Sequence, residues 1–455
     1  MKVAKFGGTS LASAEQIKKI CAIITEDPQR RLVVVSAPGK RSTDDTKVTD
    51  LLIEAARARL TGQDGGAEIE CVINRYRDIA QALNLPEDSL APIREDFLHR
   101  LHLDTRDEGL YLDTMKAGGE DNSARLVASY LRSTGIEAHY IDPGEGGMIL
   151  SDEPGNARVL KQSYGKLRAL RERPGITVFP GFFGYSEHGQ VVTFPRGGSD
   201  ITGAILAAAI DAEQYENFTD VDSVFVANPT LVKRPVAVEK ITYREMRELS
   251  YAGFSVLHDE ALEPVFHAGI PVVVKNTNNP SAPGTQIVPT RPIGTFPVVG
   301  IAATDGFCSV YISKYLMNRE VGFGRRLLQI FEDEGISFEH TPSGIDNMSV
   351  IVRESTFNKA AEERVLRRVR TELAVDEVTI ERDLALVMVV GEGMNHTIGL
   401  AGRACTAFAD ASVNLEMINQ GSSEVSMMFG IKASDIPNSV LALYNQFFGS
   451  STQHE

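Results

Sequence analysis

Short apolar runs alternate with amphipathic stretches through the first 275 residues. Isoleucines at helical spacing in residues 13–25 predict a helix with one buried face. The continuous apolar run in residues 31–36 is typical of a strand in a buried parallel sheet. Similar patterns predict strands over residues 2–6, 136–141, 176–183, 190–195, 216–219 and 271–275, and helices from residue 51 and over 65–104 (a hairpin broken near 84–88), 120–134, 201–213, 242–250 and 258–268. This alternation indicates an α/β fold of three layers, with a mainly parallel sheet between helices.

A change of composition predicts a domain boundary. Residues 276–292 are rich in Asn, Pro, Ser and Gly, which interrupt regular structure. Beyond them the chain repeats itself with an offset of 77 residues. The matching pairs are Met317/Met394, Asn318/Asn395, Gly322/Gly399, Arg326/Arg403, Phe331/Phe408, Ile336/Val413, Glu339/Glu416, Gly344/Gly421 and Ser349/Ser426. Each copy is predicted to run strand, glycine loop, helix, strand, turn and strand, so we expect two small α/β modules packed as a pair.

Composition narrows the functional classes. The 455 residues are enough for roughly two to four domains. The formal net charge of −15 argues against non-specific binding to nucleic acid or to an anionic membrane surface. None of the four cysteines lies in a CxxC pair, and no apolar run reaches the roughly 18 residues of a membrane span. Because no basic and apolar leader opens the chain, we expect a cytoplasmic protein.

The first candidate site is KFGGTS, residues 5–10, between a predicted strand and a predicted helix. Glycines let an anion approach the backbone, and the amides of residues 7–9 can point at phosphate oxygens. Lys5 would then supply a positive charge to a phosphoryl group in transfer. The alternative is a plain turn with Ser10 or Ser13 as the helix N-cap. The local sequence leaves both open.

The segment FPRGGSD, residues 194–200, has a similar design. Its glycine pair makes a tight loop, and Ser199 or Asp200 can cap the helix that follows. Arg196 can hold a carboxylate through two parallel hydrogen bonds, and Asp200 can anchor Lys5. Both glycine loops are expected at the carboxyl ends of strands in one parallel sheet, where open α/β sheets bind ligands.

Two further segments carry polar residues at predicted element ends. In AGGEDNSAR, residues 117–125, Glu120 is expected at the start of a helix, either as a cap favoured by the helix dipole or as a partner for a substrate ammonium group. In FTDVDSV, residues 218–224, Thr219, Asp220 and Asp222 either meet a nucleotide sugar or form a turn. The chain contains no P-loop of the GxxxxGKS or GxxxxGKT type, no HExxH and no GxSxG.

The order of these motifs resembles that of aspartate kinases (aspartokinases), which are members of the amino-acid kinase family. KFGGTS opens the chain, and VVVSAP, GGE, FPRGGSD and FTDVDSV follow in order. The 77-residue repeat, with GFGRRLLQIFEDEGISFEH in its first copy, is similar to the tandem ACT domains of these enzymes. The resemblance implies a catalytic domain over residues 1–292 and ferredoxin-like ACT modules over 293–380 and 381–455. The C-terminal end can pack back to complete the first module, and no fused homoserine dehydrogenase is expected.

The resemblance also implies a role for each matching residue. Lys5 and Asp200 match the catalytic residues, a lysine that stabilises the transferred phosphate and a carboxylate that organises the site. Arg196 matches an arginine that clamps an aspartate carboxylate. Substrate-binding residues are thus expected at Ser36, Thr49, Glu120, Arg196, Gly198 and Ser199, and phosphate- or nucleotide-binding residues at Gly7, Gly8, Thr9, Thr219, Asp220, Phe225 and Ser255.

Four positions depart from the family pattern. Many relatives have a tyrosine where Phe225 stands, an Asp-Pro-Arg where residues 228–230 read Asn-Pro-Thr, and a lysine where Ser255 stands. We therefore expect an active enzyme whose contacts with the nucleotide differ from those of the relatives that keep the family pattern.

The implied reaction is ATP-dependent phosphorylation of the β-carboxylate of L-aspartate to 4-phospho-L-aspartate, the first step toward lysine, threonine and methionine. A carboxylate nucleophile is already ionised at pH 7, so catalysis needs positioning and charge neutralisation but no general base. The sequence shows no dedicated metal cage, and Mg²⁺ is expected to arrive with ATP.

The ACT pair implies feedback inhibition by an end-product amino acid and a homo-oligomer, either a dimer through the ACT modules or a tetramer. Effector-binding residues are expected at Met317, Gly322, Phe323, Phe338 and Glu339, with Glu339 pairing with a lysine ammonium group. The alternatives are core packing for the two phenylalanines and a solvated surface carboxylate for Glu339. Lysine is the favoured effector, and threonine, alone or together with lysine, is second.

Two other functions are compatible with parts of the pattern. A kinase of the same superfamily acting on glutamate, carbamate or a nucleotide would keep the fold, but Glu120, Arg196 and the paired modules argue against it. A catalytically silent amino-acid sensor would need only the ACT modules, and the intact Lys5 and Asp200 argue against that.

Overall fold

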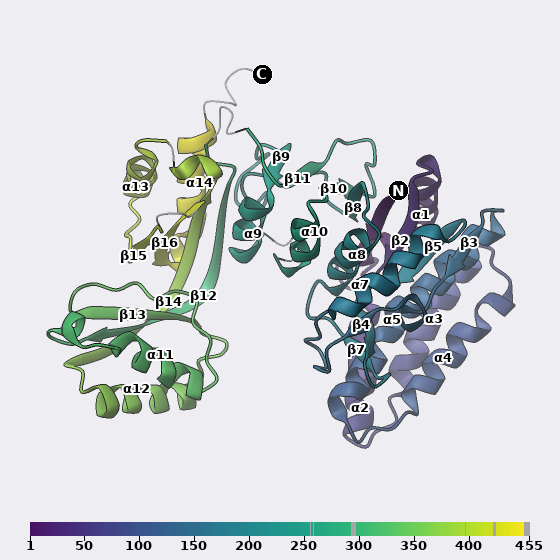
Figure 1. Ribbon diagram of the computed structural model, residues 1–455, viewed down its shortest axis with the longest axis horizontal. Coiled ribbons are helices and arrows are strands. Elements are labelled where there is room, and N and C mark those ends of the chain that lie inside the picture. The colour runs from purple at the N-terminus through teal and green to yellow at the C-terminus, as the bar shows by residue number, and fades with distance from the viewer. Residues whose placement is uncertain (255, 258, 293–296, 396, 422–424, 450–455) are drawn as a thin grey trace. The chain divides into compact units, whose positions relative to one another are not determined.

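The computed structural model describes residues 1–254, 256–257, 259–292, 297–395, 397–421 and 425–449. The chain forms two compact units (Figure 1). The first comprises Met1–Val224, Ala237–Arg247 and Ser255–Arg291, and the second comprises Phe225–Val236, Glu248–Phe254 and Pro292–Glu455. Among the helices of the described residues, none combines the length and apolar character that crossing a bilayer requires.

The first unit is built on an eight-stranded sheet in the order β3-β5-β2-β1-β8-β10-β11-β9. Neighbouring strands are parallel except β10 and β11, which are antiparallel. The mainly parallel α/β sheet predicted from the apolar runs is therefore confirmed. Its strands are β1 (Lys2–Phe6), β2 (Arg30–Val35), β3 (Ala138–Tyr140), β5 (Ile176–Pro180), β8 (Gln214–Thr219), β9 (Lys240–Thr242), β10 (Val272–Asn276) and β11 (Thr285–Val288).

Helices cover both faces of this sheet (Figure 1). On one face, Ala4 and Phe6 of β1 join a core cluster with α1 (Ala14–Glu26), α2 (Val48–Leu60), α3 (Gly66–Ala82), α4 (Ala91–Leu101) and α5 (Glu108–Ser133). Because successive side chains of a strand point to opposite faces, Lys5 faces the other layer. There α8 (Gly198–Ala209) packs on β1, β2 and β8, and it contacts α7 (Lys161–Leu167) and α10 (Glu263–Ala268). Two further helices are α6 (Pro143–Gly146) and α9 (Tyr243–Tyr251), and α9 belongs to the first unit only up to Arg247.

A separate three-stranded sheet contains β4 (Ile149–Leu150), β6 (Phe183–Ser186) and β7 (Val191–Thr193). The prediction of one strand over residues 176–183 was wrong, because the chain turns at Gly181 and Phe182 between β5 and β6. Phe182 has a φ of 76°, a left-handed conformation that a bulky side chain rarely adopts. The FPRGGSD segment follows β7, so it leaves this small sheet and not the main parallel sheet as predicted.

Two other local predictions are corrected by packing. Glu120 lies in the middle of α5 and not at the start of a helix. Gly118 and Gly119 are themselves helical, and a Cβ at Gly119 would lie 2.7 Å from the Cβ of Ala37. This glycine pair therefore serves close approach and not a turn. In the predicted boundary segment 276–292, residues 285–288 form β11 of the main sheet. The exact domain limits stay a prediction.

The second unit contains a five-stranded antiparallel sheet in the order β13-β12-β14-β16-β15. Its strands are β12 (Gly300–Ser313), β13 (Asn347–Arg353), β14 (Glu377–Val390), β15 (Met417–Asn419) and β16 (Ser426–Lys432), and its helices are α11 (Phe323–Asp333), α12 (Lys359–Leu373), α13 (Leu400–Asp410) and α14 (Ile436–Phe448). Both ends of β12 and β14, and of α11 and α13, differ by 77 residues. The predicted pair of related α+β modules is confirmed.

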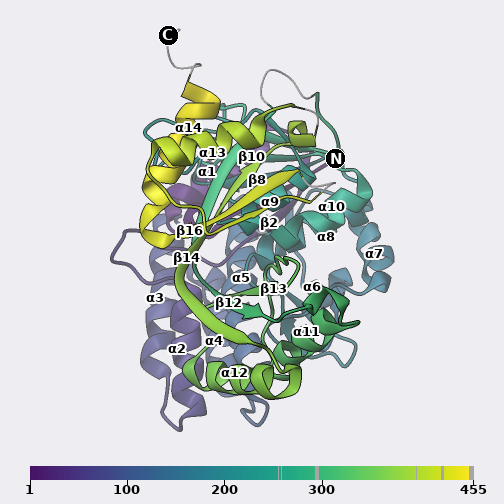
Figure 2. The ribbon, with the colours of Figure 1, turned by 90° about the vertical axis from the view of Figure 1, so that its left-hand side faces the viewer.

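The two copies share this sheet. The second half of β12 pairs with β13 and with the start of β14, whereas its first half pairs with the end of β14. The register shifts between Thr304 and Phe307, where the sheet passes from one copy to the other. Figure 2 shows α11 and α12 at one end of these long strands and α13 and α14 at the other.

A buried ion pair on the main sheet contributes to the free energy of unfolding, and this contribution can be tested. Arg30, at the start of β2, donates two hydrogen bonds to Glu216 of β8, at 2.6 and 3.1 Å, and both side chains are buried. An Arg30→Met variant is expected to lose about 3 kcal/mol of unfolding free energy, because it leaves a buried carboxylate poorly paired. Removing both partners, as Arg30→Met with Glu216→Leu, should recover most of that loss. Urea denaturation of the single and double variants measures both effects, and equal losses would contradict this account.

Candidate active site

Lys5 and Asp200 form an ion pair at the carboxyl end of β1. Lys5 Nζ lies 2.5 Å from Asp200 Oδ1, and their side chains expose 9% and 14% of their surface. Asp200 is in the first turn of α8, whose N-cap is Gly197 with a φ of 81°. The predicted cap at Ser199 or Asp200 was therefore wrong. The structure brings together the two residues that were expected to be catalytic.

Asn217 on β8 supports this pair, and sequence reasoning missed it. Lys5 and Asn217 are register neighbours in the β1–β8 pairing, and Asn217 Nδ2 donates to Asp200 Oδ1 at 2.8 Å. The hydroxyl of Tyr215 donates to the backbone carbonyl of Asp200 at 3.1 Å. Asn217 is 1% exposed, but its strand reads QYENFT, so one more polar residue within it carried little signal in the sequence. These contacts hold the carboxylate of Asp200 against Lys5.

The glycine loop after β1 packs closely on the loop after β2. Gly39 N–H donates to the carbonyl of Gly8 at 2.7 Å, and a Cβ at Gly39 would lie 2.7 Å from the carbonyl carbon of Gly8. Gly7 N–H donates to the carbonyl of Phe218 at 3.1 Å, so the expectation that it points at a phosphate is corrected. Among the described residues, the amides of Gly8 and Thr9 have no acceptor. They remain available to an anion beside Lys5.

The helix-capping question at KFGGTS is also settled by the structure. Ser13 is the N-cap of α1 and accepts from Gln16 N–H at 3.4 Å. Ser10 instead lies in a short 3-10 helix (Gly8–Leu11), and its hydroxyl hydrogen-bonds that of Thr277 at 2.7 Å. The glycine loop is therefore separated from the cap of α1 by one turn of 3-10 helix.

Glu120 is a buried carboxyl group with unused hydrogen-bonding capacity. The backbone of Ala37 hydrogen-bonds its carboxyl group, but Oε2 has no partner among the described residues. Burial raises the pKa of Glu120 to about 8, while that hydrogen bond and the positive charges of Lys116 and Lys5 act in the opposite direction. A buried acceptor without a partner is costly, so this oxygen is a candidate for a cationic ligand.

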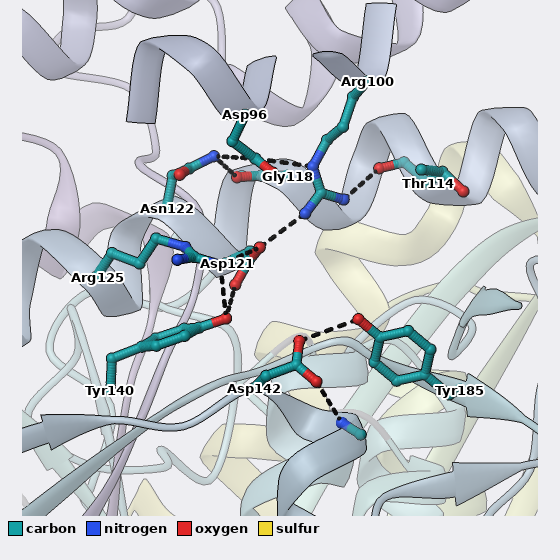
Figure 3. Close-up of polar contacts among 12 residues, drawn as sticks. Asp96, Arg100, Thr114, Gly118, Asp121, Asn122, Arg125, Tyr140, Asp142 and Tyr185 are labelled. Carbon is teal, nitrogen blue, oxygen red and sulfur yellow. Dashed lines mark hydrogen bonds and ion pairs between the residues drawn. The ribbon is translucent and has the colours of Figure 1, made fainter. Parts of the chain in front are cut away.

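A polar network fixes the helix that carries Glu120 (Figure 3). Arg100 of α4 donates to Asp121 Oδ2 at 2.7 Å and to Asp96 at 2.8 Å. Asn122 donates to the same Asp96 at 2.7 Å, and the hydroxyl of Tyr140 donates to Asp121. Helix α5 is thereby tied to α4 and to β3, directly beside Glu120.

The other predicted substrate-binding residues lie at three element ends. Ser36 follows β2 next to Ala37, and Thr49 is the second residue of α2. Gly198 and Ser199 are the first two residues of α8, where backbone amides can donate hydrogen bonds to an anion. Arg196 is exposed and makes no ion pair with any described residue. Its guanidinium group is available to a carboxylate.

The predicted nucleotide residues are only partly grouped. Thr219 ends β8, and its carbonyl accepts from Thr277 N–H at 2.9 Å. Its hydroxyl donates to Asp220 Oδ1 at 3.3 Å. Phe225 belongs to the second unit by its contacts, and Ser255 lies outside the described residues. The nucleotide roles of all four stay a prediction.

The predicted effector residues lie on both sides of α11 in the sequence, Met317, Gly322 and Phe323 at its start and Phe338 and Glu339 after its end. Met317 and Phe323 are buried in the core of the first copy, and Gly322 is the N-cap of α11 with a φ of 79°. Phe338 is 47% exposed. Glu339 is not simply solvated, because it accepts from Arg353 at 2.8 Å and from the hydroxyl of Tyr251. Core packing therefore describes Phe323, whereas Phe338 is open to a ligand.

Comparison with known proteins agrees with this arrangement. The model of the amino acid kinase family matches residues 1–276, and that of the ACT domain matches residues 387–447. The sequence is 55% identical to Aspartokinase 3 of Bacillus subtilis (strain 168), over 98% of this chain and 99% of that one. The chain belongs to the aspartokinase family. It is an enzyme, an aspartate kinase, and the predicted family and enzyme class are confirmed.

Other aspartokinases are more distant relatives. Aspartokinase 1, chloroplastic, of Arabidopsis thaliana is 30% identical, over 100% of this chain and 81% of that one. The crystal structure of Clostridium acetobutylicum aspartate kinase matches with a TM-score of 0.84 at 36% identity, over 98% of this chain and 100% of that one. E. coli aspartokinase III in complex with aspartate and ADP gives a TM-score of 0.82 at 24% identity, over the same shares, and this likeness concerns the fold alone.

Proposed function

We propose that this aspartokinase transfers the γ-phosphoryl group of Mg-ATP to the β-carboxylate of L-aspartate, giving 4-phospho-L-aspartate and ADP. Glu120 carries the proposal. It is buried, it has an oxygen without a partner among the described residues, and Lys5 lies close enough for its charge to affect the pKa of Glu120. An acceptor for an ammonium group and a cation for a phosphoryl group thus lie in one site. The product would enter lysine, threonine and methionine synthesis in the cytoplasm.

On the phosphate side, Lys5 would neutralise the charge that builds on the transferred group. Asp200, whose carboxylate accepts from Asn217, holds the ammonium group of Lys5 before substrate arrives, so little reorganisation is needed during transfer. The amides of Gly8 and Thr9 would bind phosphate oxygens at the glycine loop.

On the acceptor side, the two ends of aspartate would be held separately. Glu120 would receive the α-ammonium group, and Arg196 would clamp a carboxylate together with the amides at the start of α8. Ser36 and Thr49 would hydrogen-bond the substrate. The β-carboxylate is already ionised, so it can attack the γ-phosphorus in line while the bond to the β-phosphate oxygen breaks and ADP leaves.

Mg²⁺ would enter as part of the nucleotide substrate. Within the described residues, no group of three or more His, Cys, Asp or Glu side chains is placed to hold a metal ion. The β- and γ-phosphates of ATP offer the oxygen ligands that Mg²⁺ prefers.

The second unit would sense the end product. Lysine is the first candidate effector, with Glu339 as the partner of its ammonium group, and threonine, alone or with lysine, is the second. The assembly would be a dimer through the ACT modules or a tetramer. The contact between Glu339 and Tyr251 supports a role in signalling, because an ammonium ligand would compete for that carboxylate.

One assay tests the reaction. The protein is incubated with Mg-ATP, L-aspartate and hydroxylamine, and the acyl phosphate is trapped as its hydroxamate, with L-glutamate as the control substrate. We expect hydroxamate with aspartate only, and inhibition on titration with lysine or threonine. Absence of aspartate-dependent hydroxamate would overturn the proposed reaction, and an equal rate with glutamate would overturn the proposed specificity.

A further inference from the structure

Lys116 is a nearly buried cation on the helix that carries Glu120. It precedes Glu120 by four residues, which places both side chains on one face of α5. Its side chain is 13% exposed, and Nζ lies 2.6 Å from Asp113 Oδ1. Nζ also donates to the hydroxyl of Thr193 at 3.1 Å. A lysine is seldom buried to this extent unless it is paired, and here the pairing joins α5 to β7.

Asp113 makes this connection rigid. Its second oxygen, Oδ2, accepts from the backbone amides of Thr193 and Gly155, both at 2.7 Å. The carboxylate itself is 1% exposed. Charge-assisted hydrogen bonds from fixed backbone donors are among the stronger polar contacts in proteins. Asp113 and Lys116 together hold the last residue of β7, three residues before Arg196.

Lys116 also reaches the turn that supports the start of α8. Its Nζ lies 5.7 Å from the ring centroid of Phe182, a distance at which a cation is attracted to the ring face. A Cβ at Gly198 would lie 2.6 Å from Cδ2 of this ring, so the first residue of α8 rests on it. Phe182 N–H donates to the hydroxyl of Thr202 at 3.0 Å. Lys116 thus contacts Thr193 before the loop that carries Arg196 directly, and Gly198 after it through the ring of Phe182.

We propose that Lys116 is a positioning residue for the amino-acid substrate, which fixes the distance between Glu120 on α5 and the loop of Arg196, Gly198 and Ser199. The inference rests on the proposed function, because it takes Glu120 and Arg196 as holding the two ends of aspartate. Both groups must be correctly placed at once for the substrate to bind. Loss of the connection lets the exposed Arg196 loop move, and the binding of aspartate weakens more than that of ATP.

Steady-state kinetics of three variants test this role. Lys116→Met keeps the aliphatic length but loses the charge, and we expect KM for aspartate to rise about tenfold while KM for ATP changes by less than about twofold. Lys116→Arg keeps a cation within reach of Asp113 and Thr193, and it should restore KM for aspartate to within about threefold of the parent. Thr193→Val removes only the hydroxyl and should raise KM for aspartate less than Lys116→Met.

The controls separate this inference from the reaction itself. Lys161→Met, at an exposed lysine of α7, should leave all constants unchanged. If the parent protein shows no aspartate-dependent turnover, the proposed function fails. If the parent is active and Lys116→Met leaves KM for aspartate unchanged, or raises both KM values equally, the positioning role is overturned. If Lys116→Met does not fold, the other two variants decide. We then expect KM for aspartate to rise in Thr193→Val and to stay within about threefold of the parent in Lys116→Arg. An unchanged KM for aspartate in Thr193→Val would overturn the positioning role.

Discussion

A Lys5→Met variant is expected to lose roughly 1,000-fold in kcat, while its KM for ATP rises by less than about tenfold. The charge of Lys5 is fixed by Asp200 and Asn217 before any substrate binds. Such a preorganised charge acts mainly on the transition state, where negative charge spreads over the transferred group. Without Lys5, the carboxylate of Asp200 would also repel the phosphates. Turnover of aspartate, followed as ADP release, measures the effect.

Lys2→Met provides the matched control for this prediction. Lys2 lies on the same strand, but its ammonium group pairs with Asp27 at 2.8 Å at the opposite end of β1. Its replacement should leave kcat within about twofold of the parent. An unchanged kcat in Lys5→Met, with a thermal midpoint near that of the parent, would refute the assigned role of Lys5.

A Glu120→Gln variant is expected to raise KM for aspartate roughly 100-fold at pH 8.5. The buried carboxylate would lose its charge, and an amide cannot replace the ion pair with an ammonium group. The network of Arg100 and Asp121 below Glu120 stays intact, so the helix should keep its position. Substrate titrations at fixed Mg-ATP measure the change, and an unchanged KM would contradict the ammonium contact.

The pH dependence gives a second signature of Glu120. Burial raises its pKa to about 8, so the free enzyme holds a proton there at pH 7. A bound ammonium group favours the ionised form, so binding expels that proton and KM for aspartate should fall as pH rises from about 6 to 8. Glu120→Gln should abolish this slope, and a parallel profile in the variant would refute the assignment.

The same pKa makes a prediction about stability. In the unfolded chain Glu120 titrates near its ordinary 4.5, whereas the folded protein keeps the proton to about 8. Between these two pKa values the folded state binds more protons than the unfolded state. The contribution of Glu120 to the free energy of unfolding therefore declines as pH rises from about 4.5 to about 8. Glu120→Gln removes that decline, so its thermal midpoint should rise relative to that of the parent between pH 5 and pH 9.

Predictions from the sequence were correct where a local residue pattern alone determines the structure. The 77-residue offset reappears in the bounds of β12 and β14, because both copies need the same strand length. Lys5 and Asp200 meet because one lies near the end of a buried strand and the other in the first turn of a helix packed on that strand. By contrast, the strand over residues 216–219 was predicted, but not the function of Asn217 within it. The strand reads QYENFT, and no periodic pattern sets Asn217 apart from the other polar residues in it.

The failures have a common cause in tertiary packing. Gly118 and Gly119 look like a turn because glycine is unfavourable inside a helix. Here the close approach of Ala37 to Gly119, and of Phe97 and Arg100 to Gly118, favours glycine, and α5 runs through unbroken. Lys116 was passed over for a related reason, since a lysine in a helix is normally solvated. Only the fold shows that β7 and Phe182 lie over it.

The sheet shared by the two C-terminal copies makes each copy depend on the other during evolution. β12 contributes hydrogen bonds to both copies, and so does β14, which pairs with β16 of the second copy along its later half. Because each copy pairs with strands of the other, we expect neither copy to keep its fold when the other is removed. We therefore expect this region to be exchanged between relatives as a whole. A change in one copy is therefore selected together with its effect on the other.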